Sequence, residues 1–145
     1  MKLNISNINI KEFIQNILTQ FQPLTKKANI DLIFKSEKQT ISGYLDVKQV
    51  KKVLFNLLSN AIKYNKVGGE IIVSVDGSSF SVEDSGIGIA ENDISKIQNR
   101  YTRFNKSSGG FGIGLSIVST IAEEYNLKID ITSQERVGTK VSISW

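Results

Sequence analysis

Two segments repeat apolar residues at the spacing of an amphipathic helix. The first helix is expected over about Ile10–Ala28, with Asn9 as its cap and Pro23 late enough in the span to kink or end it. The second is expected over Val47–Tyr64, capped by Asp46. Each helix is therefore expected to bury one face. The apolar stripe of the first consists of Ile10, Phe13, Ile14, Ile17, Leu18, Phe21 and Leu24.

Shorter segments alternate apolar and polar residues, which is typical of strands with one buried face. Asp76-Gly77 between two of them is a hairpin signal. A third helix is expected from about Gly112–Gly114 to Tyr125, after a glycine-rich loop over residues 84–111 that is long enough to act as a lid. This order predicts an α+β fold, an α/β sandwich in which helices cover one face of a mixed sheet. The expected strands are Leu3–Ile5, Ile30–Phe34, Ile41–Tyr44, Glu70–Val75, Ser79–Glu83, Lys128–Ser133 and Thr139–Trp145.

The composition excludes several kinds of chemistry. The chain has 145 residues and neither Cys nor His, which excludes disulfides, thiolate or histidine metal sites and Ser-His-Asp catalysis. Lys and Arg number 18 and Asp and Glu 14, a net charge of +4. Because these charges are interspersed, a solvated surface is favoured over a nucleic-acid site. No apolar run approaches the ~20 residues that cross a bilayer, so the chain is expected to be cytoplasmic or to face the cytosol.

A narrow polar seam runs along the otherwise apolar second helix. At about 100° per residue, Asn56, Asn60 and Lys63 align on one side, one turn apart. Amide oxygens are ligands for hard cations such as Mg²⁺, and a lysine ammonium can meet a phosphate. The seam therefore indicates a site for a cation and a phosphate, and an ordinary solvated face is the alternative interpretation.

Asp84 continues the buried side of the strand Ser79–Glu83 at period two. A buried carboxylate needs hydrogen bonds. Either the following Ser85-Gly86 turn supplies them, or a ligand does, and the edge of adenine with its exocyclic amine is suitable. Gly86 and Gly88 are expected to let a ligand ring approach the backbone closely.

A second glycine-rich stretch, Gly109–Leu115 (GGFGIGL), precedes the third helix. Backbone amides at a helix N-terminus that are free of side chains can bind phosphate. The G-x-G-x-G spacing matches neither the P-loop nor the Rossmann fingerprint. A phosphate site and a flexible hinge are therefore both open interpretations of this stretch.

Taken in order, these stretches resemble the ATP-binding catalytic domain of bacterial sensor histidine kinases, in the GHKL or Bergerat-fold superfamily. NLLSNAIKYN (Asn56–Asn65) is similar to the N box of that family, and DSGIGI (Asp84–Ile89) and GGFGIGL (Gly109–Leu115) are similar to its two glycine boxes. Gly138-Thr139 matches its closing glycine motif. The resemblance implies a single domain over residues 1–145, with three helices on one face of the sheet and a mobile lid at about residues 90–111.

The resemblance also implies roles for individual residues. It implies that Asn60 binds Mg²⁺, that Asn56 lies beside the metal and the phosphates, that Lys63 contacts phosphate and that Asp84 accepts the adenine amine. Arg103 keeps the basic position of the family and is implied to reach the γ-phosphate. The other residues implied to bind the cofactor ATP are Tyr64, Gly86, Gly88, Ile89, Gly110, Phe111, Gly112, Gly114, Leu115 and Thr139.

Asn56 bears on which reaction the resemblance implies. Related ATPases and serine kinases usually have Glu at this position, which can take a proton from water or a hydroxyl, whereas an amide cannot. A histidine acceptor needs no such base, because its neutral nitrogen is already a nucleophile. The implied function is transfer of the γ-phosphate of Mg-ATP to a histidine, and the absence of His from this chain places that acceptor on a separate dimerisation domain.

The further partner implied is a response regulator of a two-component phosphorelay, and the parent protein is expected to be an inner-membrane sensor. The chain departs from the family in its lid, where Gln98 stands in place of the first of two phenylalanines. This departure favours one alternative, a non-catalytic nucleotide-binding regulatory module. A Bergerat-type ATPase is the other alternative.

Overall fold

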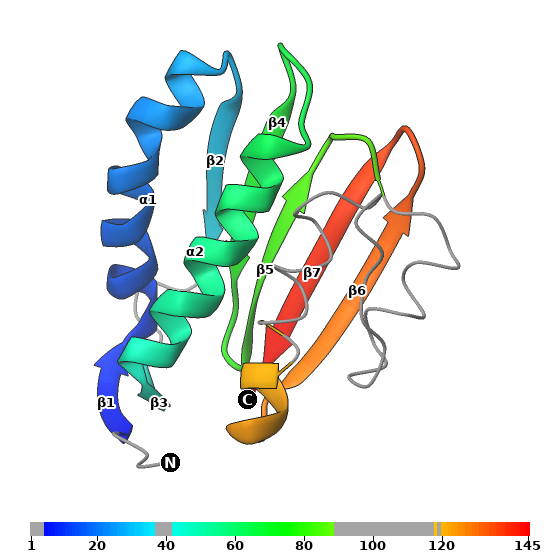
Figure 1. Cartoon of the computed structure of the whole chain (residues 1–145). Coiled ribbons are helices and arrows are strands. Elements are labelled where there is room, and N and C mark those ends of the chain that lie inside the picture. The colour runs from blue at the N-terminus through cyan, green and yellow to red at the C-terminus, as the bar shows by residue number, and fades with distance from the viewer. Residues whose placement is uncertain (1–4, 37–41, 89–117, 119) are drawn as a thin grey trace.

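The computed structural model describes residues 5–36, 42–88, 118 and 120–145. Within this part of the chain, two long helices lie on one face of a five-stranded sheet, and a two-stranded sheet lies beyond one end of it (Figure 1). Residues 120–124 form a further short helical stretch. The helices are α1 (Ile10–Lys27) and α2 (Val47–Lys63). The strands are β1 (Ile5–Asn9), β2 (Asp31–Ser36), β3 (Ser42–Asp46), β4 (Glu70–Val75), β5 (Ser79–Asp84), β6 (Lys128–Gln134) and β7 (Gly138–Ser144).

The larger sheet is mixed, with the strand order β2-β4-β5-β7-β6. β2 and β4 are parallel, and the other neighbours are antiparallel. β1 and β3 form the separate antiparallel pair. β4 and β5 are joined by the predicted turn at Asp76, where Oδ1 accepts hydrogen bonds from the backbone N–H groups of Ser78 at 2.9 Å and Ser79 at 2.8 Å. The predicted α+β class and this hairpin are confirmed.

Both helices begin at the caps predicted from the sequence. Oδ1 of Asn9 accepts a hydrogen bond from the backbone N–H of Glu12 at 3.1 Å. Oδ1 of Asp46 accepts from Lys48 at 3.1 Å and from Gln49 at 3.4 Å. Each side chain satisfies N–H groups that the first turn of a helix leaves without intrahelical partners, so a local chemical rule fixes both start positions.

Pro23 lies inside α1, which continues to Lys27. Proline removes one backbone hydrogen bond of the helix and crowds the preceding turn. Phe21 and Thr25, on either side of it, are only 4% and 3% exposed. Burial of this face offsets the cost of the proline. The predicted span of about Ile10–Ala28 is confirmed to within one residue, and of the two effects considered for Pro23, ending the helix does not occur.

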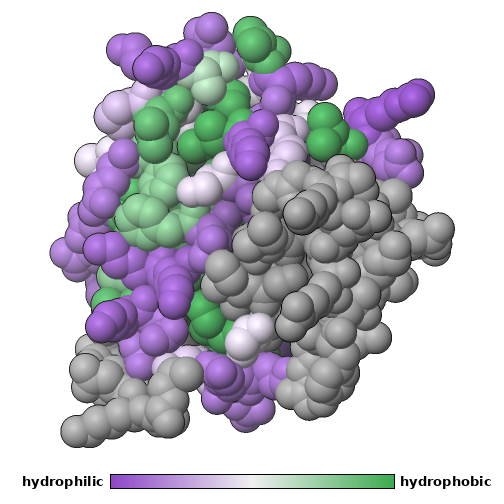
Figure 2. Space-filling model, viewed as in Figure 1, coloured by the Kyte–Doolittle hydropathy of each residue, from purple (hydrophilic) through white to green (hydrophobic). Residues whose placement is uncertain are grey.

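The apolar core lies between the helices and the sheet. Leu54 and Leu58 of α2 and Ile71 and Val73 of β4 are fully buried. Val118, which is helical together with residues 120–124, belongs to the same core. Figure 2 shows that the outer side of the helices is largely hydrophilic, with hydrophobic residues gathered where α1 and α2 lie side by side. The helices therefore hold a single apolar layer against one face of the sheet.

Six of the seven predicted strands occur, with ends that depend on their partners. The predicted strand Leu3–Ile5 shares only Ile5 with β1, which pairs with β3 from Ile5–Asp46 to Asn9–Ser42, and residues 3 and 4 lie outside the described residues. β5 extends one residue further than predicted, to Asp84, which pairs with Thr139 of β7. The start of the predicted third helix and most of the loop over residues 84–111 lie outside the described residues. Among the described helices, none combines the length and the apolar character that spanning a membrane requires.

Candidate functional site

The C-terminal half of α2 carries the polar seam predicted from the sequence. Asn56 is half-buried, and its Nδ2 donates to the carbonyl oxygen of Lys52 at 2.8 Å. Nδ2 of Asn60 is buried and has no hydrogen-bond partner within the described part of the chain. Lys63 is exposed in the last turn, with its Nζ 5.3 Å from the centroid of the Tyr64 ring. A wholly solvated face would account for Lys63, but it does not account for the buried amide of Asn60.

Asp84 ends β5 on the side of the sheet that faces the core. Its register partners, Ile71 of β4 and Thr139 of β7, are 0% and 5% exposed, and paired residues of antiparallel strands share a face. The side chain is half-buried, and its Oδ1 accepts a hydrogen bond from the backbone N–H of Gly86 at 2.9 Å. The predicted inward carboxylate is confirmed, and the turn after it supplies one of its hydrogen bonds.

The environment of Asp84 makes its charge costly. The pKa of this carboxyl is raised from 3.8 to about 6, chiefly by burial and to a small extent by the neighbouring Glu83 carboxylate. Hydrogen bonds from the backbone of Gly86 and Thr139 act in the opposite direction and lower the pKa without cancelling the effect of burial. A further hydrogen-bond donor at this carboxylate would stabilise its charged form. A ligand with a hydrogen-bond donor, such as an amine, would therefore interact favourably with the ionised carboxylate.

The glycines after Asp84 are required by the protein's own backbone. A Cβ on Gly86 would overlap the carbonyl oxygen of Tyr64, and a Cβ on Gly88 would overlap that of Gln134. Gly88 also has a φ of +73°, which L residues with side chains rarely adopt. Neighbouring backbone occupies the space that a side chain would need, which is a structural reason for both glycines, and the close approach of a ligand ring stays a prediction.

The closing motif Gly138-Thr139 lies directly against Asp84. A Cβ on Gly138 would overlap the carbonyl oxygen of Asp84, and this glycine has a φ of +149°. Thr139 is buried, and its Oγ1 lies 2.7 Å from Oγ of Ser133, a hydrogen-bonding distance. The closing motif and the carboxylate therefore lie side by side in the fold.

The loop after β5 connects the carboxylate to the end of α2. The backbone N–H of Ile87 donates to the carbonyl oxygen of Tyr64 at 3.0 Å, and the carbonyl oxygen of Ile87 accepts from the N–H of Arg136 at 2.6 Å. The loop is thereby held between the C-terminus of α2 and the turn that joins β6 to β7. The polar seam, Asp84 and Thr139 are thus parts of one connected region.

The remaining predicted site residues cannot be placed in this region, because they lie outside the described residues. They are Ile89, Arg103, Gly110, Phe111, Gly112, Gly114 and Leu115. Conversely, sequence reasoning missed Asn65, Gly69 and the contacts of Ser85, which form a hydrogen-bonded group beside the site. The local signals were modest: a polar residue just after the helix end and a Gly-Gly turn before β4.

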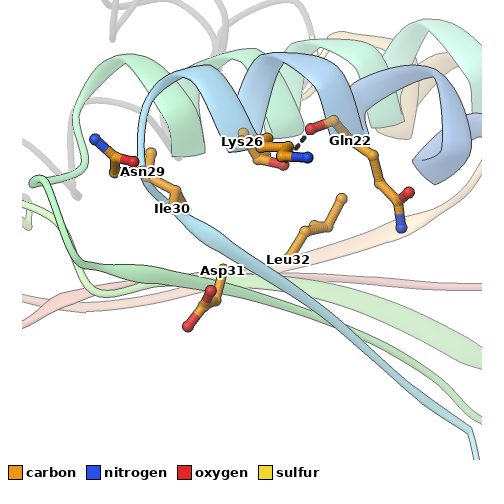
Figure 3. A pocket seen from close by; sticks show the side chains of 7 residues that line it. Gln22, Lys26, Asn29, Ile30, Asp31 and Leu32 are labelled. Atoms are coloured by element: carbon orange, nitrogen blue, oxygen red, sulfur yellow. Dashed lines mark hydrogen bonds between the residues drawn. The ribbon is translucent and has the colours of Figure 1, made fainter.

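A separate pocket of about 410 Å³ lies between the C-terminal part of α1 and the edge strand β2 (Figure 3). Leu32 points toward α1 in this view, and Asp31 points to the other side of the strand. The side chains that line the pocket include one ammonium, one carboxylate, two amides and one hydroxyl, which together select no class of ligand. None of its lining residues was predicted as a site residue: they are Gln22, Thr25, Lys26, Asn29, Ile30, Asp31 and Leu32.

The sequence of this chain is similar to those of sensor kinases. It is 34% identical to histidine kinase P4 of Formosa agariphila and 30% identical to the sensor histidine kinase WalK of Bacillus subtilis. Both alignments cover 94% of this chain, but only 11% and 24% of the respective relatives. The chain therefore spans a minor part of the length of the curated relatives that it matches.

Solved structures and a family profile agree with these relatives. The catalytic domain of histidine kinase ThkA has a TM-score of 0.83 at 27% identity, covering 97% of this chain and 94% of that chain. ThkA in complex with the response regulator protein TrrA has a TM-score of 0.79 at 26% identity, covering 96% of this chain and 40% of that chain. Residues 45–145, which are more than half of the chain, match the family profile itself. The chain belongs to the family of histidine kinase-, DNA gyrase B- and HSP90-like ATPases.

Proposed function

We propose that residues 1–145 form the catalytic and ATP-binding domain of a sensor histidine kinase, with a lid at about residues 90–111. The domain binds Mg-ATP and transfers the γ-phosphate to a histidine on a separate dimerisation domain. The observation that carries this proposal is the connection between Asp84 and the amide seam of α2, made by the hydrogen bond from Ile87 to Tyr64. In this proposal, one nucleotide contacts Asp84 with its base and the amide seam of α2 with its phosphates and cation.

The described residues fit a nucleotide with its cation. The half-buried carboxylate of Asp84 offers an acceptor to an exocyclic amine, and Thr139 lies beside it. The buried amide of Asn60 lacks a partner within the described residues, and a buried polar group left unpaired costs about 1–3 kcal/mol. The unpaired atom is the donor Nδ2, and a phosphate oxygen that accepts from it would remove that cost. We assign Asn60 to Mg²⁺, for which an amide oxygen is a suitable ligand.

In the proposed complex, residues of α2 stabilise the negative charge on the transferred phosphoryl group. Lys63 presents an ammonium at the end of α2, and Asn56 presents a neutral amide one turn before Asn60. Mg²⁺, when bound, would neutralise charge on the phosphate oxygens. Asn56 and Arg103 are the proposed catalytic residues, and Tyr64, Gly86, Gly88 and the predicted site residues outside the described part of the chain complete the proposed nucleotide site.

A histidine acceptor is favoured over water or a hydroxyl. The amide of Asn56 cannot accept a proton at neutral pH, and its Nδ2 already donates to Lys52. A neutral imidazole needs no base to attack the phosphate. The role of this chain is then to position the nucleotide and to stabilise charge.

The partners follow from the same proposal. The chain contains no His, so the phosphoacceptor belongs to a dimerisation domain outside this sequence. A response regulator receives the phosphoryl group from that histidine, and the structure of ThkA with the response regulator protein TrrA supports this assignment. We place the domain on the cytoplasmic side of the membrane, as part of an inner-membrane sensor.

A phosphotransfer assay tests the proposed function. The domain is mixed with the purified His-containing dimerisation domain of its parent kinase and with ATP labelled at the γ-phosphate. We expect acid-labile, base-stable label on the dimerisation domain. Nucleotide binding without such label would instead indicate a regulatory module. Steady phosphate release by the domain alone, lost in Asn56→Ala, would indicate an ATPase.

Binding of adenosine is expected to weaken in acid, because the proposed contact needs the ionised form of Asp84. With a pKa of about 6 in the free protein, affinity should change little between pH 8 and pH 7 and fall about tenfold by pH 5. Adenosine is the appropriate probe because it carries no phosphate that titrates in this range. The measurement is a calorimetric titration at several pH values, and an affinity that is equal at pH 5 and pH 7 would contradict the contact.

A further inference from the structure

We infer that Ser85 and Asn65 are positioning residues, which fix the spacing between the adenine side and the phosphate side of the site. The inference rests on the proposed function for its ligand. Neither residue needs to touch the nucleotide. They act through a closed ring of hydrogen bonds that joins three segments: the residue that follows the cap of α2, the first residue of β4 and the loop after β5.

The ring contains Ser85, Asn65 and Glu70. Oγ of Ser85 donates to Oδ1 of Asn65 at 3.1 Å, Nδ2 of Asn65 donates to the carbonyl oxygen of Glu70 at 3.0 Å, and the N–H of Glu70 donates to Oγ of Ser85 at 2.8 Å. The N–H of Ser85 also donates to the carbonyl oxygen of Glu70 at 3.2 Å. Each side chain both donates and accepts, so the bonds can strengthen one another.

The ring specifies the residue types that form it. Oδ1 of Asn65 accepts a second hydrogen bond, from the N–H of Lys66 at 2.9 Å, while its Nδ2 faces the carbonyl oxygen of Glu70. A carboxylate at position 65 has almost the same shape, but it would set an oxygen against that carbonyl oxygen. At position 85 the serine hydroxyl both donates to Asn65 and accepts from the N–H of Glu70 through a single oxygen, which an alanine side chain cannot do.

Gly69 leaves the space in which the ring closes. A Cβ at this position would overlap Oδ1 of Asn65 and would lie 2.7 Å from Oγ of Ser85. Gly69 has no positive φ that would explain a glycine there, so its requirement is steric. The turn before β4 is therefore shaped around the ring.

The ring spans the two halves of the proposed site. On the adenine side, Ser85 directly follows Asp84. On the phosphate side, Asn65 directly follows Tyr64, the C-terminal cap of α2, and Asn60 lies one turn before that cap. The hydrogen bond from the N–H of Ile87 to the carbonyl oxygen of Tyr64 joins the same loop to the end of α2. A ligand that contacts both Asp84 and α2 binds more tightly when the distance between them is already fixed in the free protein. A ligand that contacts Asp84 alone gains nothing from it.

This difference gives a readout that general destabilisation would not produce. The affinities of Mg-ATP and of adenosine are measured for the wild type, Ser85→Ala and Asn65→Asp. We expect both variants to bind Mg-ATP about tenfold more weakly, the loss typical of one or two hydrogen bonds, and to bind adenosine within about twofold of the wild type. Ser85→Thr keeps the hydroxyl and should restore Mg-ATP binding.

Ser79→Ala is the matched control, because Oγ of Ser79 donates to Asp76 at 3.0 Å in the turn at the other end of β5. It should leave both affinities unchanged. Equal weakening of Mg-ATP and adenosine in Ser85→Ala would overturn the inference, since it would show only that Asp84 had moved. Unchanged Mg-ATP affinity would overturn it as well.

Hydrogen exchange separates this inference from the proposed function. The N–H of Ile87 should exchange about tenfold faster in Ser85→Ala than in the wild type, without any nucleotide present, because the loop opens more often when the ring is broken. An unchanged exchange rate would show that the ring does not hold the loop. If the wild type bound neither ligand, the proposed function would fail, whatever the exchange rate of Ile87.

Discussion

Replacement of Asp84 by Asn is expected to weaken ATP binding by about 100-fold. A loss of this order is typical when a buried polar group of a binding site is left without its hydrogen-bond partner. The carboxylate can accept a hydrogen bond from the adenine amine, whereas the amide can turn a donor toward that donor. GTP should lose much less affinity, because guanine presents an acceptor at the same edge. Equal losses for ATP and GTP would contradict an adenine contact at Asp84.

The same substitution is expected to stabilise the protein without nucleotide at neutral pH. The pKa of Asp84 is raised from 3.8 to about 6 in the folded state, so ionisation costs more there than in the unfolded chain. This cost is fully present above pH 6 and disappears as the pH falls toward 4, where the folded state takes up the proton first. Since the side chain is only half-buried, we expect a gain of about 1–2 kcal/mol, below the limit set by the full shift.

Urea unfolding at pH 7.5 and pH 4 tests this stability effect. Asp84→Asn should raise the free energy of unfolding at pH 7.5 and leave it nearly unchanged at pH 4. Glu83→Gln is the matched control, because it removes the same charge from the exposed neighbouring residue. A destabilised Asp84→Asn variant at pH 7.5 would contradict the account of the raised pKa. A gain in stability with a loss of affinity would show that the carboxylate is retained for binding.

Local rules account for much of the fold and for part of the site. The caps Asn9 and Asp46 bond to residues two or three positions away, so the sequence contains all that is needed to place them. The side of β5 on which Asp84 lies follows from alternation along six residues. The polar seam of α2 follows from helical period in the same way.

Contacts between distant segments account for what the sequence did not predict. The ring around Ser85 joins residues 15 and 20 positions apart, and no local pattern links them. A side chain at Gly86 is excluded by the carbonyl oxygen of Tyr64, which the fold brings there from 22 positions earlier in the chain. A sequence can show that a glycine is present, but only the fold shows which atoms take the place of its side chain.

Replacement of Asn60 by Ala is expected to remove most of the dependence of ATP affinity on Mg²⁺. In the wild type Mg²⁺ should strengthen ATP binding, and in Asn60→Ala this enhancement should fall on the order of 100-fold, since even outer-shell partners of a metal cost 10–100-fold when removed. Asn60→Asp keeps an oxygen ligand and adds a charge, so it should retain the response to Mg²⁺. Calorimetric titration with ATP, with and without MgCl₂, measures both effects.

Folding should not confound this result. Nδ2 of Asn60 has no hydrogen-bond partner among the described residues, and its backbone carbonyl, which accepts from Tyr64, is unaffected by the side chain. Alanine is also the better helix former, by several tenths of a kcal/mol. Ser59→Ala on the exposed side of the same turn is the control and should leave the Mg²⁺ response unchanged. If Asn60→Ala kept that response, the metal would have to be held by other residues.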